Sequence, residues 1–388
     1  MKIPRILKKR RHSRPYVVYW NNIPSPYMVE RFNALVNRAD FEFEAWFNDR
    51  LEADRSWVVN EKDWRFQYRY VDKVHLLGKN FHFPLLLIKK RPSILVTLHA
   101  QPSFIFGWMI AIIRGVKTAF WVEVTYDKWI KRNRIKEWIK RQLLPRADAI
   151  ITVGNDGKQF AEKYGVQPDK IFFAPHTIDV PHYANLSLAA RKHRNSFRKT
   201  LKLEGFTYIY VGRLWWGKGI NYLLDAFKKV QQQSTEPISL LLLGDGEEKQ
   251  NLRQICEHKK IQNVVFAGFI QKPELPQYYA AADVFVFPTL GDPYGLVVDE
   301  AMACSLPIIS TSSAGEIRDR VKEGINGYIV PPQDSNALAV KMLYLANSHG
   351  LCKRMGNMSA RIIHGHTPDK WAEDFKEIVN NMSYGINS

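Results

Sequence analysis

Short runs of Val, Ile, Leu and aromatic residues alternate along this chain with longer stretches in which apolar residues recur at helical spacing. The short runs are apolar almost throughout, which is typical of strands buried on both faces of a parallel sheet. A helical stripe is clearest where Ile220, Leu223, Leu224, Phe227 and Val230 share one face. The pattern predicts strands at 16–20, 94–98, 118–122, 149–153, 208–211, 239–243, 264–267, 284–287 and 307–310.

Repeated alternation of strand and helix predicts an α/β fold built from open parallel sheets. At 388 residues the chain is long enough for two domains, each with its own core. The segment 181–201 is polar, basic and poor in periodicity, so we place the junction there. The predicted units are residues 1–190, residues 191–370, and a C-terminal helix within 371–388 that returns to the first domain.

Composition excludes several other classes of protein. Aromatic residues make up 13% of the chain, which argues against disorder. The three cysteines, Cys256, Cys304 and Cys352, are widely spaced, which argues against a disulfide framework or a zinc site and favours a reducing compartment. The basic start lacks the apolar stretch of a signal peptide, and the longest apolar run is about half of what crosses a bilayer. We therefore expect a soluble or peripheral protein.

The positive charge of the chain is concentrated in its first half. The formal net charge is +18, and residues 1–180 carry 32 Lys and Arg against 18 Asp and Glu. An excess of this size indicates an anionic partner, which could be nucleic acid, phospholipid or a phosphorylated substrate.

The most basic stretch is 128–146, with eight Lys or Arg and one Glu among apolar residues that include Trp129 and Trp138. A basic amphipathic helix with tryptophan is typical of a surface that rests on anionic lipid. The alternative is an ordinary helix packed on the core with a solvated basic face. No recognition motif supports nucleic-acid binding.

A glycine-containing turn at 211–219 follows a predicted strand and opens a helix. Glycines there let backbone N–H groups approach a phosphate, and the helix N-terminus adds partial positive charge. Arg213 and Lys218 would add two cations, which suits a diphosphate leaving group. The alternative is a simple turn with solvated cations.

Two acids, Asp292 and Glu300, stand eight residues apart at the start of another predicted helix. The amides near 294–297 could receive a phosphate or a sugar hydroxyl, and Glu300 could accept hydrogen bonds from ribose hydroxyls. The alternative makes Asp292 an N-cap and Glu300 an exposed helix residue.

Taken together in order, these stretches resemble the retaining glycosyltransferases of family 4, which have two Rossmann-like domains facing each other across a cleft (the GT-B architecture). The best matches are VGRLWWGKGINYLLDAF, LLLLGDGEEKQNL, VVFAGFI, AAADVFVFPT and AGEIRDRVKEGINGYIVPPQD, with looser matches at NNIPSPYMVERFNAL, RADAIITVG and IFFAPHTIDV.

The resemblance implies roles for residues that match the family motifs. Arg213 and Lys218 match the cation pair on the donor diphosphate, and Glu300 matches the acid that grips the nucleotide ribose. Asp292 matches the acid near the donor sugar, where the family has Glu. Ser305 replaces a usual Gly and His176 a common Asn. The implied donor-binding residues are Gly212, Arg213, Lys218, Gly268, Tyr294, Gly295, Leu296, Val297 and Glu300.

The first half departs from the family at one position. Family members often place a His after the strand in KTAFWVEVTYD, and this chain has Glu123 there, which could accept a sugar hydroxyl. His99 is a further polar candidate at a strand end, although such a residue is more often structural. Asn22 and residues 24–27 follow the first strand, where an acceptor loop would lie. The absence of Gly-x-Gly-x-x-Gly after that strand weighs against a nicotinamide enzyme.

The resemblance therefore predicts an enzyme that transfers a sugar from a UDP- or GDP-sugar to a hydroxyl of a saccharide or lipid-linked glycan, in surface polysaccharide or glycolipid synthesis. It implies retention by front-face attack. No metal and no cofactor are expected, because Arg213, Lys218 and a helix N-terminus can supply the positive charge. We expect a cytoplasmic protein on the inner face of the cell membrane, with no nucleic-acid partner. The alternatives are a sugar-nucleotide epimerase on the same fold and a non-catalytic basic module that binds membrane or nucleic acid.

Overall fold

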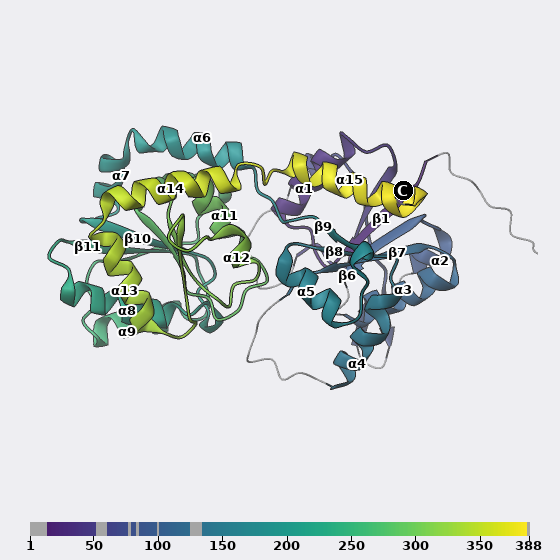
Figure 1. The fold of residues 1–388 in the computed structure, drawn as a ribbon, viewed down its shortest axis with the longest axis horizontal. Coiled ribbons are helices and arrows are strands. Elements are labelled where there is room, and N and C mark those ends of the chain that lie inside the picture. The colour runs from purple at the N-terminus through teal and green to yellow at the C-terminus, as the bar shows by residue number, and fades with distance from the viewer. Residues whose placement is uncertain are drawn as a thin grey trace, which may run out of the picture.

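The computed structural model describes residues 14–51, 60–76, 79–82, 85–98, 101–124 and 134–385, which form two α/β domains that face each other (Figure 1). The N-terminal sheet has the strand order β3-β2-β1-β6-β7-β8-β9, and its strands are all parallel. Their bounds are β1 Tyr16–Asn21, β2 Glu42–Phe47, β3 Gln67–Tyr70, β6 Ile94–Leu98, β7 Lys117–Val122, β8 Ala149–Thr152 and β9 Ile171–Phe173. A separate hairpin pairs β4 (Lys73–Leu76) with β5 (Lys79–His82).

The C-terminal sheet has the order β12-β11-β10-β13-β14-β15 and is also parallel throughout. Its strands are β10 Phe206–Val211, β11 Ile238–Leu243, β12 Val264–Gly268, β13 Val284–Phe287, β14 Ile308–Thr311 and β15 Gly327–Val330. Because the chain order reverses beside β10, the loops after β10 and β13 meet at the carboxyl edge of the sheet, where ligands of open α/β sheets bind.

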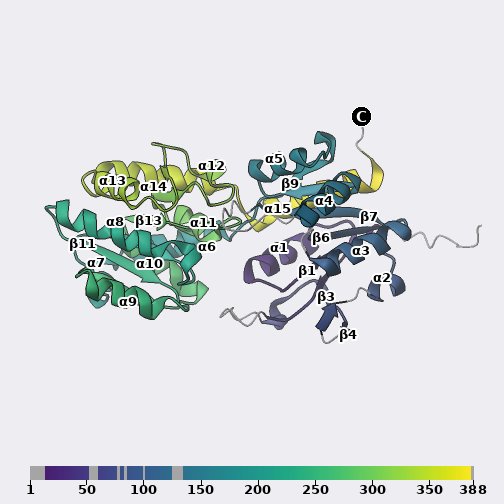
Figure 2. The ribbon, with the colours of Figure 1, turned by 90° about the horizontal axis from the view of Figure 1, so that it is seen from below.

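Helices cover the sheets in both domains (Figures 1 and 2). Those that begin in the first half are α1 Pro26–Val36, α2 Leu85–Lys89, α3 Pro102–Ile113, α4 Arg134–Leu143, α5 Asn155–Lys163 and α6 Val180–Arg191. The others are α7 Arg194–Thr200, α8 Ile220–Gln233, α9 Lys249–His258, α10 Leu275–Ala281, α11 Leu296–Ala303, α12 Ile317–Arg320, α13 Ser335–Ala346, α14 His349–Ile363 and α15 Pro368–Tyr384.

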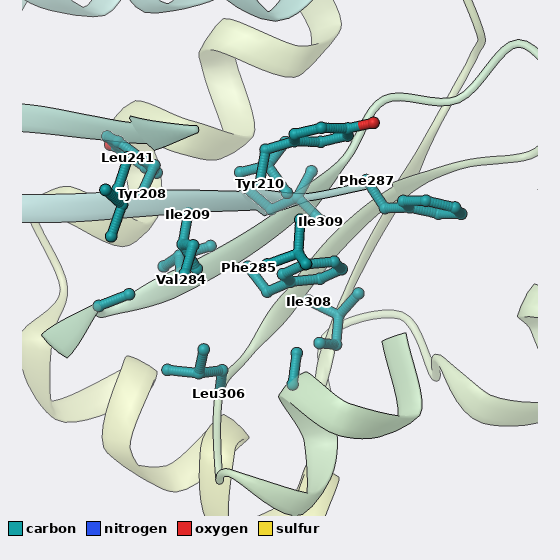
Figure 3. Packing of buried hydrophobic residues seen from close by; sticks show 14 of the residues in the cluster. Tyr208, Ile209, Tyr210, Leu241, Val284, Phe285, Phe287, Leu306, Ile308 and Ile309 are labelled. Atoms are coloured by element: carbon teal, nitrogen blue, oxygen red, sulfur yellow. The ribbon is translucent and has the colours of Figure 1, made fainter. Parts of the chain in front are cut away.

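The burial of the strands in the core of the C-terminal domain explains why the sequence predicts them. Tyr208, Ile209, Leu241, Phe285 and Ile308 are fully buried between strands and helices (Figure 3). Each comes from a run that is mostly apolar and that is buried even at polar positions such as Thr207, Ser239 and Ser310, because both faces of the parallel sheet are covered. All nine predicted strands are present, with ends that shift by at most two residues.

The strands that the sequence pattern missed carry polar residues or are very short. β2 reads EFEAWF, in which Glu44 breaks the apolar run. The structure buries Glu44 all the same, because Arg69 (2.5 Å), Lys90 (3.0 Å) and the Tyr16 hydroxyl bind its carboxylate. Three other strands, β3, β9 and β15, are only three or four residues long. A segment that short shows no clear pattern of apolar residues.

The segment 181–201 is helical, whereas the sequence indicated an irregular junction. α6 contacts α10 and α11, and Tyr183 of α6 lies in the core of the C-terminal domain. The predicted boundary between residues 190 and 191 thus falls in the last turn of α6, and both α6 and the following α7 contact α10 of the second domain. The chain returns at its end, where α15 packs on α1 of the N-terminal domain through Trp371 and Phe375 (Figure 1).

Some predictions concern residues outside the described ranges: the basic residues 1–13, His99, and the part of the basic stretch that includes Trp129. Within the described ranges no helix is both long and apolar enough to cross a bilayer. The three cysteines are unpaired and buried.

Candidate active site

The turn after β10 is shaped by a glycine that no other residue could replace. Gly219 has φ +65°, and a Cβ added to it would lie 2.2 Å from the carbonyl oxygen of Pro288. This contact between the β10–α8 and β13–α11 loops fixes where α8 begins, and it places Lys218 directly before the helix.

Two residues singled out from the sequence meet across these loops. The Lys218 ammonium forms an ion pair with Asp292, 74 residues along the chain, and both side chains are largely buried. Lys218 Nζ also lies 5.7 Å from the ring centre of Phe287. Asp292 accepts a hydrogen bond from the Tyr294 amide at 2.9 Å, whereas the N-cap position of α11 belongs to Gly295. The alternative reading of Asp292 as N-cap is therefore wrong.

Arg213 has a carboxylate partner of its own. Its guanidinium lies 3.2 Å from Glu247, in the turn before α9, and 5.7 Å from the centre of the Trp215 ring. The two predicted cations thus come from one loop but pair with different acids.

The start of α11 presents backbone amides beside Asp292. Gly295 has φ +76°, and an added Cβ would meet the Phe287 ring at 2.7 Å. The helix begins at Leu296, and the amides of Leu296 and Val297 have no acceptor within the helix because they lie in its first turn. These N–H groups and the positive end of the helix dipole can receive an anion.

Glu300 is fully buried, so its alternative reading as an exposed helix residue is wrong. It accepts hydrogen bonds from the hydroxyls of Tyr279 (2.7 Å) and Tyr27, and Tyr27 comes from the N-terminal domain. Burial raises the pKa of Glu300, although these hydroxyls act in the opposite direction. Its contact with a ribose remains a prediction, as do the other donor contacts.

Glu123 is held by a chain of polar side chains in the N-terminal domain. It accepts hydrogen bonds from Trp121 Nε1 and His176 Nε2, each at 2.8 Å, and Arg31 lies 2.9 Å from the other ring nitrogen of His176. Because a guanidinium can only donate, Nδ1 of His176 accepts and its proton lies on Nε2. Burial would raise the pKa of Glu123, but His176, Trp121 and Arg31 outweigh it and lower the pKa to about 2. Glu123 is therefore a fixed carboxylate.

Arg31 and the tyrosines around Glu300 are functional residues that no sequence motif indicated. Arg31 is buried on α1, with Trp121 and Trp371 rings 5.5 and 5.2 Å from its guanidinium carbon. Arg31 stands directly after Glu30 in the α1 sequence PYMVERFNALV, so its local sequence did not distinguish it from a solvated cation. Nothing in the sequence indicated which tyrosines would reach Glu300.

Gly268 ends β12 with φ +78°, and its carbonyl accepts the Gly244 amide at 2.7 Å. Gly212 lies at the end of β10, where its amide donates to Leu243 at 3.0 Å. Both glycines lie at the carboxyl edge of the sheet, but no contact in the structure joins Gly268 to Lys218 or Asp292. Across the described ranges, His, Cys, Asp and Glu form no group of three or more that could hold a metal ion.

Several contacts join the two domains at this edge. Tyr294 stacks edge-on against His176, with ring centres 5.0 Å apart, and donates to its carbonyl at 3.3 Å. Lys272 pairs with Glu30, and its ammonium lies 4.6 Å from the Tyr27 ring centre. The residues around Asp292 and Glu300 thus lie against those around Glu123.

A second interdomain contact is acidic. Glu316 accepts the amides of Asp156 and Gly157 at the start of α5, both at 2.8 Å, and Asp319 accepts from Asn155 at 2.7 and 2.9 Å. Burial, followed by the nearby charges of Asp156 and Asp319, raises the pKa of Glu316 to about 7 in spite of the two amides.

We expect this contact to weaken as the pH rises. A Glu316 that is exposed when the domains separate regains its ordinary pKa of 4.5, so the contact favours the protonated form. Its stabilisation is complete below pH 4.5 and is lost as the pH rises through about 7. Small-angle scattering at pH 5.5 and 8 should show a larger radius of gyration at the higher pH. Glu316→Gln should remove most of that difference, and an equal difference in both proteins would contradict the prediction.

Comparisons with known proteins agree with this architecture. Residues 192–361 match the family model described as glycosyl transferases group 1, and residues 45–181 match the model described as glycosyltransferase family 4. An uncharacterized glycosyltransferase of Methanocaldococcus jannaschii is 30% identical over 44% of this chain and 43% of its own length. The UDP-Gal:alpha-D-GlcNAc-diphosphoundecaprenol alpha-1,3-galactosyltransferase of Escherichia coli is 24% identical over 76% of this chain and 77% of its own length.

Among solved structures, Anabaena HepE in complex with UDP superposes with a TM-score of 0.75 at 16% identity, over 94% of this chain and 100% of that one. At that identity the likeness shows the fold, which is GT-B as expected. The chain spans about half the length of the first curated relatives that it matches, between 43% and 57% for three of them.

Proposed function

Because this chain belongs to the glycosyltransferase families that the two models describe, we propose that it transfers a sugar from a UDP-sugar to a hydroxyl of a saccharide or lipid-linked glycan, with retention of anomeric configuration. The observation that carries the proposal is the meeting of Lys218 and Asp292 beside the first amides of α11. UDP in the HepE complex and the UDP-Gal donor in the name of the E. coli relative support the choice of nucleotide.

In this proposal the cations and the helix stabilise the leaving diphosphate. The ammonium of Lys218 and the amides of Leu296 and Val297 form a preorganised group of donors where negative charge develops. Asp292 would hold Lys218 in place before the donor binds and then face the donor sugar. No metal is required for that charge stabilisation, and no cofactor takes part.

Glu123 is suited to binding rather than to proton transfer. With its pKa at about 2 it is a weak base, and it can accept a hydrogen bond from a sugar hydroxyl. We therefore assign the acceptor proton to the departing phosphate oxygen, in a front-face reaction without a separate general base.

Calorimetric titration with UDP and with GDP tests the donor site directly. We expect UDP to bind the parent protein, and Lys218→Ala to abolish or strongly weaken that binding. Lys259→Ala is a matched control, because Lys259 forms an exposed pair with Asp225 on the same domain. Binding of GDP alone would change the donor class, and binding of neither nucleotide would favour the non-catalytic basic module. Formation of a glycosylated acceptor, rather than an epimerised sugar nucleotide, separates transfer from epimerisation.

We further propose that the protein docks on an anionic membrane through α4, in line with a lipid-linked acceptor and a location at the inner face of the cell membrane. None of the residues of α4 is buried, and Ile135 and Trp138 are 68% and 62% exposed. Exposed apolar side chains on a basic helix fit the headgroup region of a bilayer better than a packed core.

Co-sedimentation with vesicles tests this surface. More protein should be recovered with phosphatidylglycerol-containing vesicles than with pure phosphatidylcholine, and Trp138→Ala should reduce that excess. Trp216→Ala is the matched control, because Trp216 is also exposed, at 52%, but lies on the other domain. Equal recovery with both vesicle types would contradict the proposed docking of α4 on an anionic membrane.

A further inference from the structure

A separate hollow of about 310 Å³ opens on the C-terminal domain, beside the loop that carries Lys218. Its walls are the β10–α8 loop and the adjoining helices α8 and α9, which pack on each other (Figure 1). Leu290 and Gln333 close it from the loops after β13 and β15. The volume lies at the small end of the range for ligand sites in proteins.

One wall of this hollow is aromatic. The rings of Trp215 and Trp216 lie edge to face with centres 5.3 Å apart, and Trp216 is 52% exposed. A Cβ on Gly217 would lie 2.6 Å from the Trp215 ring, so only a residue without a side chain leaves room for the ring in this position. An exposed indole face offers a rigid apolar surface at little cost in conformational entropy, and the C–H face of a pyranose ring is complementary to it.

The rest of the lining combines the apolar residues Ile220, Leu252, Ile255 and Leu290 with polar ones. Asn221, Asn251 and Gln333 contribute side-chain amides, which both donate and accept as sugar hydroxyls require. Asn251 is oriented by a 2.7 Å hydrogen bond to Glu248, a carboxylate that also lines the hollow. Gln333 holds φ +64°, a backbone conformation that non-glycine residues rarely adopt and that concentrates at ligand sites.

Charge separates this hollow from the donor site. Among the described residues that line it there is no Lys or Arg, and Glu248 is its one charged group. A nucleotide phosphate would meet a carboxylate in this lining, and Arg213, 5.7 Å from the centre of the Trp215 ring, is already paired with Glu247. A neutral sugar would meet both apolar and hydrogen-bonding residues there. Lys218, Asp292 and Glu300 do not line it.

We propose that this hollow is a second saccharide site, which binds a neutral pyranose unit of a glycan. Trp216 supplies the stacking face, and Asn221, Asn251 and Gln333 bind the hydroxyls. Because η4 (Trp216–Lys218) joins the stacking residue to the donor-side lysine, a bound glycan would lie next to the donor loop without entering the donor site. Occupancy requires no reaction, so its test does not depend on the proposed transfer.

Saturation-transfer NMR on the full chain tests the site. The probes are the methyl α-glycosides of glucose, galactose and N-acetylglucosamine, each measured with and without excess UDP. We expect at least one to receive saturation, equally in both conditions, and Trp216→Ala to weaken its affinity by about tenfold, the effect of losing one aromatic contact. Asn221→Ala should weaken it as well, and Trp138→Ala should leave it unchanged.

The proposal is overturned by any of three results. The first is that no probe receives saturation, and the second is that excess UDP abolishes the signal, which would assign the sugar to the donor site. The third is that Trp216→Ala leaves sugar binding intact while it lowers affinity for UDP, which would make the hollow a nucleotide base site.

Discussion

Replacing Lys218 with alanine is expected to slow sugar transfer by about 30- to 900-fold, which corresponds to about 2–4 kcal/mol of lost transition-state stabilisation. The ammonium group is held in a largely buried position by Asp292 and lies next to the first turn of α11. Charge that develops on a leaving diphosphate would meet it without reorganisation, and in a partly desolvated site that interaction is strong. The effect should therefore appear in kcat as well as in kcat/KM, measured with the nucleotide sugar whose nucleotide binds.

Two controls separate catalysis from damage to the fold. Lys218→Ala leaves Asp292 without its partner, so thermal unfolding must show that the variant remains folded. Lys259→Ala removes a cation of similar type from an exposed pair and should leave turnover within twofold of the parent, since such pairs contribute little. A turnover rate for Lys218→Ala equal to that of the parent would mean that the phosphate site lies elsewhere.

Replacing Arg320 with alanine is expected to destabilise the C-terminal domain by about 3–5 kcal/mol, because it leaves a buried carboxylate without its partner. Arg320 lies 2.7 Å from Asp299, and both side chains are at most 1% exposed. The same guanidinium donates to the carbonyls of Tyr294, Gly295 and Gly315. Burial alone would lower the pKa of Arg320, but Asp299 and its other acidic neighbours raise it.

The midpoint of urea unfolding measures this effect, and Arg318→Ala is the matched control. Arg318 is exposed on the same short helix, so its loss should change stability by less than about 0.5 kcal/mol. Because Arg320 also fixes the loop that carries Asp292, the surviving folded Arg320→Ala protein should bind UDP more weakly. An unchanged midpoint would show that the pair contributes nothing to stability.

Much of the donor half could be predicted from the sequence because its signals are local. Gly219 and Gly295 mark turns where only glycine fits, and each follows a buried, mostly apolar strand. Since the loops after β10 and β13 share one edge of a parallel sheet, Lys218 and Asp292 could be expected in the same region. The pattern of apolar residues did not predict strands in which a polar residue is buried by partners far along the chain, as Glu44 of β2 is by Arg69 and Lys90.

The sequence by itself determined the fold class, the mostly apolar strands of both sheets, and the turns that bring Lys218 and Asp292 together. These features depend on residues that are close together in the sequence, so the local sequence pattern can predict them. Only the tertiary structure decided that Tyr27 reaches Glu300, that Arg31 and His176 hold Glu123 as a carboxylate, and that Glu316 joins the domains at the start of α5. Each of these contacts links groups between 53 and 273 residues apart, and their burial and pKa values exist only once these distant segments have folded together.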